Sequence, residues 1–174
     1  YDVRARIYRS VFAGACGVTY GHHQVWQFLN ADLYPPINVG DTVIGWRTAL
    51  KAEAANQLHH LKRLMLSRPY FDRLADSTLI AADRGRDYTD IRVATRDQRG
   101  TYAFVYLPQN KPIAVDLRKL SGDQVAVTWF NPTTGRAERS TPIKSKGIVT
   151  LTPPRHGTDW VLILDDASQG YTLP

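Results

Sequence analysis

The hydrophobic pattern of the chain changes near residue 70, and this change limits the folds open to it. Before residue 70, apolar residues recur at the three- and four-residue spacing of amphipathic helices. After it, apolar and polar residues alternate in short runs separated by turn residues, which is typical of β-strands. A length of 174 residues fits one compact domain or two small ones. We therefore predict two regions, residues 1–70 and 71–174, with a boundary at Pro69 to Asp72.

The alternating runs predict an antiparallel β-sandwich over residues 71–174. Strands are expected at 91–95, 101–107, 113–117, 124–130, 136–140, 148–151 and 160–165, with no helix between them. Trp129 and Phe130 point to opposite faces of one strand, so at least one is expected in the core. Packing is the favoured interpretation of the other, and a ligand platform is the alternative. Trp160 opens an apolar run and is expected to be buried.

The first region carries too few elements to fold by itself. A helix is expected at 4–14, a strand at 17–20, an irregular stretch at 21–45 with turn signals at 35–36 and 40–41, and one helix at 46–67. In the first helix, Ile7, Val11 and Ala15 share a face, away from Arg4. A lone strand cannot pair its amides, but helix–strand–loop–helix is the terminal βα slice of a (β/α)8 barrel. We interpret Tyr1, which lies within a helical pattern, as a fragment boundary.

The composition limits the kinds of molecule that the chain is expected to bind. The net charge is +6, but the basic residues are scattered and form no nucleic-acid motif, so no nucleic acid is expected, and affinity for an acidic polysaccharide is compatible with the charge. No apolar run is long enough to span a membrane. Cys16 is the one cysteine and is expected to be a buried, inert thiol.

A polar and aromatic cluster follows the expected strand at residues 17–20. Active sites of (β/α)8 barrels lie on the loops after the strands, and aromatic faces and imidazoles suit sugar rings and hydroxyl groups. We predict Tyr20, His22, His23 and Trp26 as substrate-binding residues. The alternatives are a histidine that satisfies loop backbone groups, Trp26 as a core residue, and a metal site. No third ligand stands at a recognisable offset, so no metal and no cofactor is predicted.

Glycoside cleavage normally needs two carboxyl groups. The first region offers Asp2, Asp32, Asp41 and Glu53. Glu53 lies within a helix and Asp2 at the start of the chain, whereas Asp32 and Asp41 lie in the long loop, where they are placed to border a cleft. Nothing in their spacing marks a catalytic pair, so the catalytic residues are expected upstream of Tyr1.

Several stretches, in order along nearly the whole chain, carry a resemblance to a known family. Residues 12–27 (FAGACGVTYGHHQVWQ) and the helix that exits at Ser67-Arg68-Pro69 resemble the end of the catalytic barrel in apiosidase-like glycoside hydrolases. Residues 102–108, 129–135 and 159–162 resemble the β-sandwich that closes these proteins and is labelled a collagen-binding domain.

The resemblance implies a secreted bacterial enzyme, periplasmic or extracellular, that acts on plant cell-wall glycans such as the pectin rhamnogalacturonan II. It implies a retaining mechanism in which an Asp and a Glu come from earlier barrel strands, so the chain alone is expected to be inactive. The expected partners are an oligo- or polysaccharide and the missing N-terminal barrel portion. The alternatives are a non-catalytic carbohydrate-binding or structural sandwich, or a subunit of a split enzyme.

Overall fold

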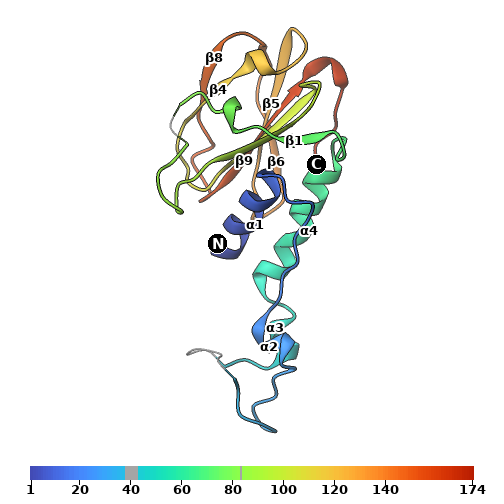
Figure 1. Ribbon diagram of the computed structural model, residues 1–174, viewed down its shortest axis with the longest axis vertical. Coiled ribbons are helices and arrows are strands. Elements are labelled where there is room, and N and C mark those ends of the chain that lie inside the picture. The colour runs from blue at the N-terminus through green and yellow to red at the C-terminus, as the bar shows by residue number, and fades with distance from the viewer. Residues whose placement is uncertain (38–42, 83) are drawn as a thin grey trace.

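The computed structural model describes residues 1–37, 43–82 and 84–174 (Figure 1). The helices are α1 Asp2–Phe12, α2 His23–Trp26, α3 Trp46–Ala49 and α4 Glu53–Leu66. The strands are β1 Arg73–Ala75, β2 Val93–Asp97, β3 Tyr102–Leu107, β4 Ile113–Asp116, β5 Gln124–Phe130, β6 Ala137–Arg139, β7 Ile143–Lys144, β8 Ile148–Leu151 and β9 Trp160–Asp166. Short 3-10 helices, which the alternating pattern did not predict, are η1 Ser77–Leu79, η2 Leu117–Lys119 and η3 Ala167–Gln169.

The strands form two antiparallel sheets, and the predicted antiparallel pairing is confirmed. The larger sheet has the order β1-β2-β3-β9-β5-β6, with β7 also pairing with β5. The last strand, β9, lies between β3 and β5, so that Ile163 stands opposite both Phe104 and Thr128. The smaller sheet pairs β4 with β8. The strands β1 and β7, of three and two residues, were not predicted from the sequence, whereas the equally short β6 lies within the strand predicted at 136–140.

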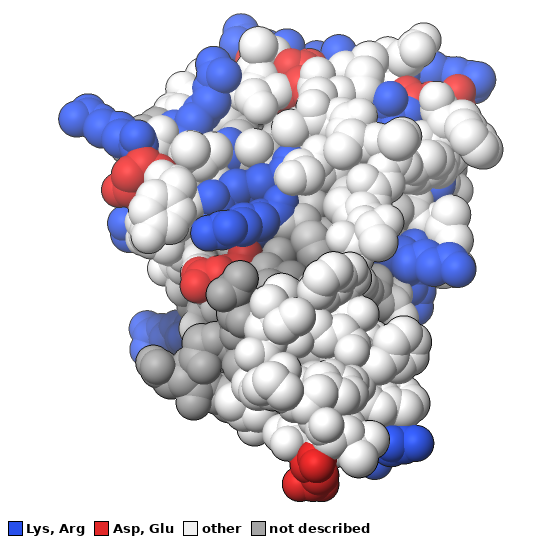
Figure 2. Space-filling model, turned by 60° about the horizontal axis from the view of Figure 1, so that its bottom comes forward, with Lys and Arg blue, Asp and Glu red and all other residues white. Residues whose placement is uncertain are grey.

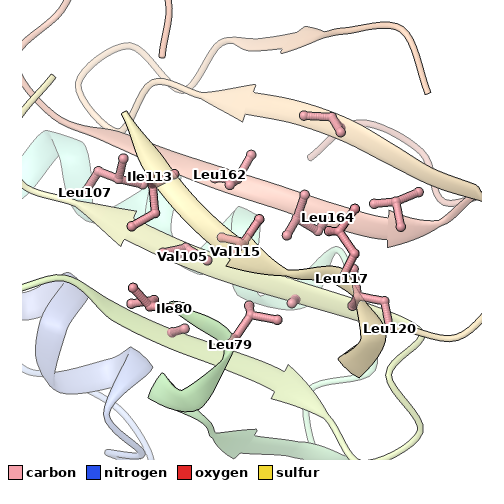
Figure 3. Packing of buried hydrophobic residues seen from close by; sticks show 14 of the residues in the cluster. Leu79, Ile80, Val105, Leu107, Ile113, Val115, Leu117, Leu120, Leu162 and Leu164 are labelled. Atoms are coloured by element: carbon pink, nitrogen blue, oxygen red, sulfur yellow. The ribbon is translucent and has the colours of Figure 1, made fainter. Parts of the chain in front are cut away.

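One face of the large sheet packs against the small sheet. Ala103, Val105 and Leu107 of β3 point to this side and are fully buried. Figure 3 shows Val105 and Leu107 in one cluster with apolar side chains of β4 and β9 and of the η1 turn. Trp129 and Trp160 belong to the same cluster, so the prediction that Trp160 is a core residue is confirmed.

The opposite face of the large sheet is covered by α1 and α4 (Figure 1). The alternate residues of β3, Tyr102, Phe104 and Tyr106, point to this side and are buried. Phe130 joins them, whereas Trp129 faces the small sheet. Both members of the Trp129-Phe130 pair are therefore core residues, and the packing interpretation is confirmed.

The face that α1 buries differs from the predicted one. Tyr8 stacks on Tyr106 with ring centroids 5.2 Å apart, and Phe12 stacks on Phe104 at 5.9 Å. Ile7 is only partly buried, and Ala15 lies beyond the end of the helix. Val11 is buried as predicted, but the prediction missed the aromatic residues that match the tyrosines and phenylalanine of β3, and it wrongly excluded Arg4.

Two further predictions in the first region are wrong. Residues 17–20 form no strand, since no neighbouring strand is present for them among the described residues. The single helix predicted over 46–67 is two helices, α3 and α4, with residues 50–52 between them. Leu61 and Met65 of α4 pack in the cluster against the large sheet, whereas Leu50 is outside this cluster and is 53% exposed. The turn signal at 40–41 lies outside the described residues.

The thiol of Cys16 is exposed, so the prediction of a buried thiol is wrong. Tyr70, which follows α4, donates to the Cys16 carbonyl and holds this stretch of the chain in place.

Two buried arginine–aspartate pairs join the helices to β9. Arg4 of α1 donates through Nε and Nη2 to Asp159, over 2.9 and 2.8 Å, just before β9 begins. Arg68, which follows α4, donates in the same bidentate way to Asp165 within β9, over 2.8 Å twice. All four residues are less than a tenth exposed.

Each carboxylate has further partners. The phenol of Tyr106 donates to Asp159 over 2.8 Å, and the hydroxyl of Thr158 donates to it over 2.9 Å. Burial, and next the Asp159 carboxylate, raise the pKa of Tyr106, so Tyr106 stays a neutral donor. Arg68 also donates to the Thr172 carbonyl over 3.0 Å. These additional hydrogen bonds offset part of the cost of burying the charges.

We predict that Arg68→Met strongly destabilises the protein, because it leaves the Asp165 carboxylate buried without its cation. Removing one partner of a buried pair costs about 3–5 kcal/mol. Urea unfolding measures the loss. The control is Arg118→Met, which breaks an equally bidentate pair with Asp116 at the surface, where the Arg118 side chain is 67% exposed. Equal losses in the two variants would contradict the importance of the buried pair.

The turn between β5 and β6 touches α4 through a glycine. Gly135 has a φ of +68°, and a Cβ there would clash with the imidazole of His60. Arg63 of α4 donates to the Gly135 carbonyl. Burial, followed by the neighbouring His59 and Arg63, lowers the pKa of His60, which keeps this ring neutral beside the turn.

Replacing Gly135 by alanine is expected to destabilise the protein more than replacing Gly147, which shares the φ of +68° but has open space around it. The left-handed backbone alone costs about 1–2 kcal/mol in each variant. Only Gly135→Ala must also displace the side chains of His60 and Arg63. Thermal melting compares the two, and indistinguishable melting temperatures would rule out a steric role for this contact.

Candidate functional site

The predicted site residues lie on a lobe built by α2, α3 and the segments around them, at the end of the molecule far from the sheets (Figure 1). His22 caps α2 with its carbonyl, which accepts from the amides of Val25 and Trp26 over 2.9 Å each. Leu29 is fully buried, and its carbonyl accepts from the amide of Trp46 over 2.9 Å, which connects α2 to α3. The lobe thus has a small core of its own.

His23 and Trp26 form a stacked pair on α2. Their ring centroids are 5.5 Å apart with 18° between the planes, and Trp26 is 71% exposed. The core interpretation of Trp26 is therefore wrong. His23 Nε2 donates to the Ile37 carbonyl over 2.8 Å, so the alternative in which a histidine satisfies loop backbone groups applies to His23. One face of the indole rests on the imidazole, and the exposed indole remains available to a ligand.

Gln27 fixes the same stretch of loop. Its side-chain amide donates to the Ile37 carbonyl over 2.7 Å, and its oxygen accepts from the Ile37 amide over 2.9 Å. This two-point contact holds the backbone that His23 also contacts. The orientation of the imidazole, and with it that of Trp26, thus depends on Gln27, which the sequence did not single out.

Tyr20 and His22 form a second ring pair. Their centroids are 6.3 Å apart and the planes are nearly perpendicular, at 88°. His22 Nδ1 is buried and makes no hydrogen bond among the described residues. The four predicted residues are therefore arranged as two ring pairs on consecutive segments, with His22 directly before α2 and His23 its first residue.

The sequence missed an aromatic group on the neighbouring helix. Phe28 adopts a positive φ of 50°, and its ring makes a T-shaped contact with that of Trp46, with the ring centroids 5.6 Å apart. The guanidinium of Arg47 lies 4.4 Å from the Trp46 ring centroid. Trp46 had been assigned to the start of a long helix. Trp46 is the first residue of α3 directly after Gly45, as it is of the helix predicted over 46–67, so its place in the sequence gave no signal of the contact with Phe28.

The carboxylates of this region do not form a catalytic pair in the part of the chain that the structure describes. Glu53 accepts from the side-chain amide of Gln57 over 2.7 Å, and Gln57 in turn accepts from Arg4. Asp2 opens α1, Asp32 lies in an exposed turn, and Asp41 lies outside the described residues. Among the residues described, no group of three or more His, Cys, Asp or Glu side chains is arranged to hold a metal ion.

The surface of the lobe is largely apolar. Phe28, Leu33 and Ile37 are 60% or more exposed. Figure 2, which turns this end toward the viewer, shows few charged side chains over it and basic side chains above it. Within the described residues, no helix is long and apolar enough to cross a membrane.

The protein consists of antiparallel sheets with a helical lobe that is rich in aromatic residues at one end. Two protein families match its sequence. Residues 1–72 match a family described as "Apiosidase-like, catalytic domain", and residues 74–165 match one described as "Putative collagen-binding domain of a collagenase". The second match covers more than half of the chain, which therefore belongs to the family of that domain, and residues 1–72 are similar to an apiosidase-like catalytic domain.

Two solved structures of glycoside hydrolases are similar to the chain over nearly its whole length. A glycoside hydrolase family 5 protein from Bacteroides vulgatus ATCC 8482 has 32% identity and a TM-score of 0.89, over 98% of this chain and 37% of that one. A structure titled "Glycoside hydrolase" has 32% identity and a TM-score of 0.82, over 96% of this chain and 37% of that one. The chain thus spans little more than a third of the length of either. No curated protein matches it.

Proposed function

We propose that this chain is the C-terminal part of an apiosidase-like glycoside hydrolase and supplies a substrate-binding wall but not the catalytic carboxylates. The likeness to glycoside hydrolases supports the reaction class. The observation that carries the binding role is the exposed indole of Trp26, supported from behind by His23. A flat apolar ring held in a fixed orientation suits the apolar face of a sugar ring.

We extend the proposal to the architecture. Residues 1–70 are the end of a (β/α)8 catalytic barrel, and residues 71–174 are an accessory β-sandwich. In support, residues 1–72 match a catalytic-domain family and the matched structures are much longer than this chain. The catalytic Asp and Glu belong to earlier strands of the barrel.

The proposed substrate is a pectic glycan of the plant cell wall, and the proposed location is the periplasm or exterior of a bacterium. The net charge of +6 is compatible with an acidic polysaccharide. A role of the sandwich as a separate binding module has less support, because both faces of the large sheet are covered, one by α1 and α4 and the other by β4 and β8.

Trp26→Ala is expected to weaken the binding of oligosaccharides released from rhamnogalacturonan II by about tenfold, or about 1.4 kcal/mol, because the stacking surface is lost. NMR titration suits weak binding by a single wall. The control is Tyr88→Ala, which removes an aromatic ring that is also 71% exposed but lies outside the lobe. Equal weakening in both variants, or no binding to the unmodified chain, would refute the proposed wall.

The chain of residues 1–174 alone is expected to hydrolyse no aryl glycoside, because it lacks the carboxyl pair that the reaction needs. Release of nitrophenol from a panel of nitrophenyl glycosides is the measurement. Turnover that disappears in Asp32→Asn or Asp41→Asn would show that the catalytic pair lies within this chain after all.

A further inference from the structure

An arginine of the lobe lies over a tryptophan ring and has no anionic partner. The guanidinium of Arg47 is 4.4 Å from the centroid of the Trp46 ring. Arg47 is exposed and makes no salt bridge in the part of the chain that the structure describes. In contrast, Arg4, Arg68 and Arg118 each hold an aspartate through two nitrogen atoms.

The ring beneath Arg47 is held by a strained residue. The φ of +50° at Phe28, whose ring contacts Trp46, lies in the left-handed region that bulky residues rarely adopt. The hydroxyl of Tyr34 donates to the carbonyls of Gln27 and Phe28 and thereby fixes this turn. Because Phe28 is 64% exposed, burial of its ring does not offset the strain. Backbone strain of this kind collects at sites that bind ligands, and here it fixes the position of Trp46.

A guanidinium that lies over an aromatic ring is well prepared to bind a carboxylate. Its N–H groups lie in the plane of the guanidinium, so they point outward at the rim and match the two oxygens of a carboxylate. Contact with the ring also restricts the side chain before binding, which reduces the entropy lost on binding. No carboxylate of the described residues takes this place, so the anion is expected from a bound molecule.

We propose that Arg47 is a specificity-determining residue that binds the carboxylate of a uronic acid, while Trp26 contacts a sugar ring. The inference rests on the proposed function, because it assumes that the lobe binds a glycan. The elements that carry the two residues, α2 and α3, lie side by side (Figure 1). Lys51, one helical turn after Arg47, is a second exposed cation that favours an anionic ligand. A carboxylate is favoured over other anions because uronic acids carry the charge of pectic glycans.

The test compares trigalacturonate with its methyl ester, which has the same sugar rings but no carboxylate charge. NMR titration of residues 1–174 with each oligosaccharide gives the two dissociation constants. We expect the acid to bind at least about tenfold more tightly than the ester, because only the acid makes the charge-assisted contact. The side-chain signals of Arg47 and Trp46 are expected to shift with the acid.

Two charge-removing variants locate the contact. Arg47→Met keeps an apolar side chain over Trp46 but removes the charge, so it is expected to bind the acid about tenfold more weakly and the ester unchanged. The control is Arg6→Met, which removes the same charge from an exposed position of α1 outside the lobe. This control is expected to keep the full preference for the acid.

Three outcomes would overturn the role of Arg47. These are equal affinities of the unmodified chain for acid and ester, an Arg47→Met variant that keeps the preference for the acid, and equal losses in Arg47→Met and Arg6→Met. If Trp26→Ala leaves both affinities unchanged but Arg47→Met removes the preference, the proposed wall fails and the acid site stands. If Trp26→Ala weakens both affinities but Arg47→Met has no effect, the wall stands and the acid site fails.

Discussion

The buried pairs Arg4–Asp159 and Arg68–Asp165 are the constraint on which the arrangement of the helices depends. Each aspartate lies at one end of β9 and each arginine comes from the helical region, so neither charge is tolerable inside the protein unless α1 and the exit of α4 lie against the sheet. As a consequence, α1 and α4 cover Tyr102, Phe104 and Tyr106 of β3. The helices and the large sheet are therefore joined by one interface that contains both ion pairs and apolar contacts. A domain tethered only by a flexible linker would have no such interface.

Short apolar runs separated by turn residues were sufficient to locate most of the sheet. The runs in β3, β5 and β9 were readable because every second residue enters a different core, and both sets are apolar. The helical region was less predictable, since its partners lie far away in sequence. Arg4 looks like a surface residue until Asp159 is placed beside it, and residues 17–20 look like a strand although no described strand pairs with them.

The candidate site was predictable in its composition but not in its geometry. The density of aromatic and imidazole groups after Tyr20 pointed to the lobe, and the structure gives Trp26 the exposure that a sugar platform needs. No periodicity could indicate that His23 is engaged by the Ile37 carbonyl, or that Gln27 holds the same backbone, because these contacts depend on the path of an irregular loop. Trp46 was missed for the same reason, since its partner Phe28 reaches it only through a left-handed backbone.

The position of β9 has a consequence for biosynthesis. A ribosome delivers β3 and β5 first, yet these two strands have no direct pairing and meet only through β9, which is made after both. β3 and β5 carry apolar side chains on both faces, and both lack the strand that pairs with them until residue 166 has left the ribosome. Arg4 and Arg68 are synthesised before Asp159 and Asp165, so neither buried ion pair can form until these residues at the two ends of β9 have left the ribosome.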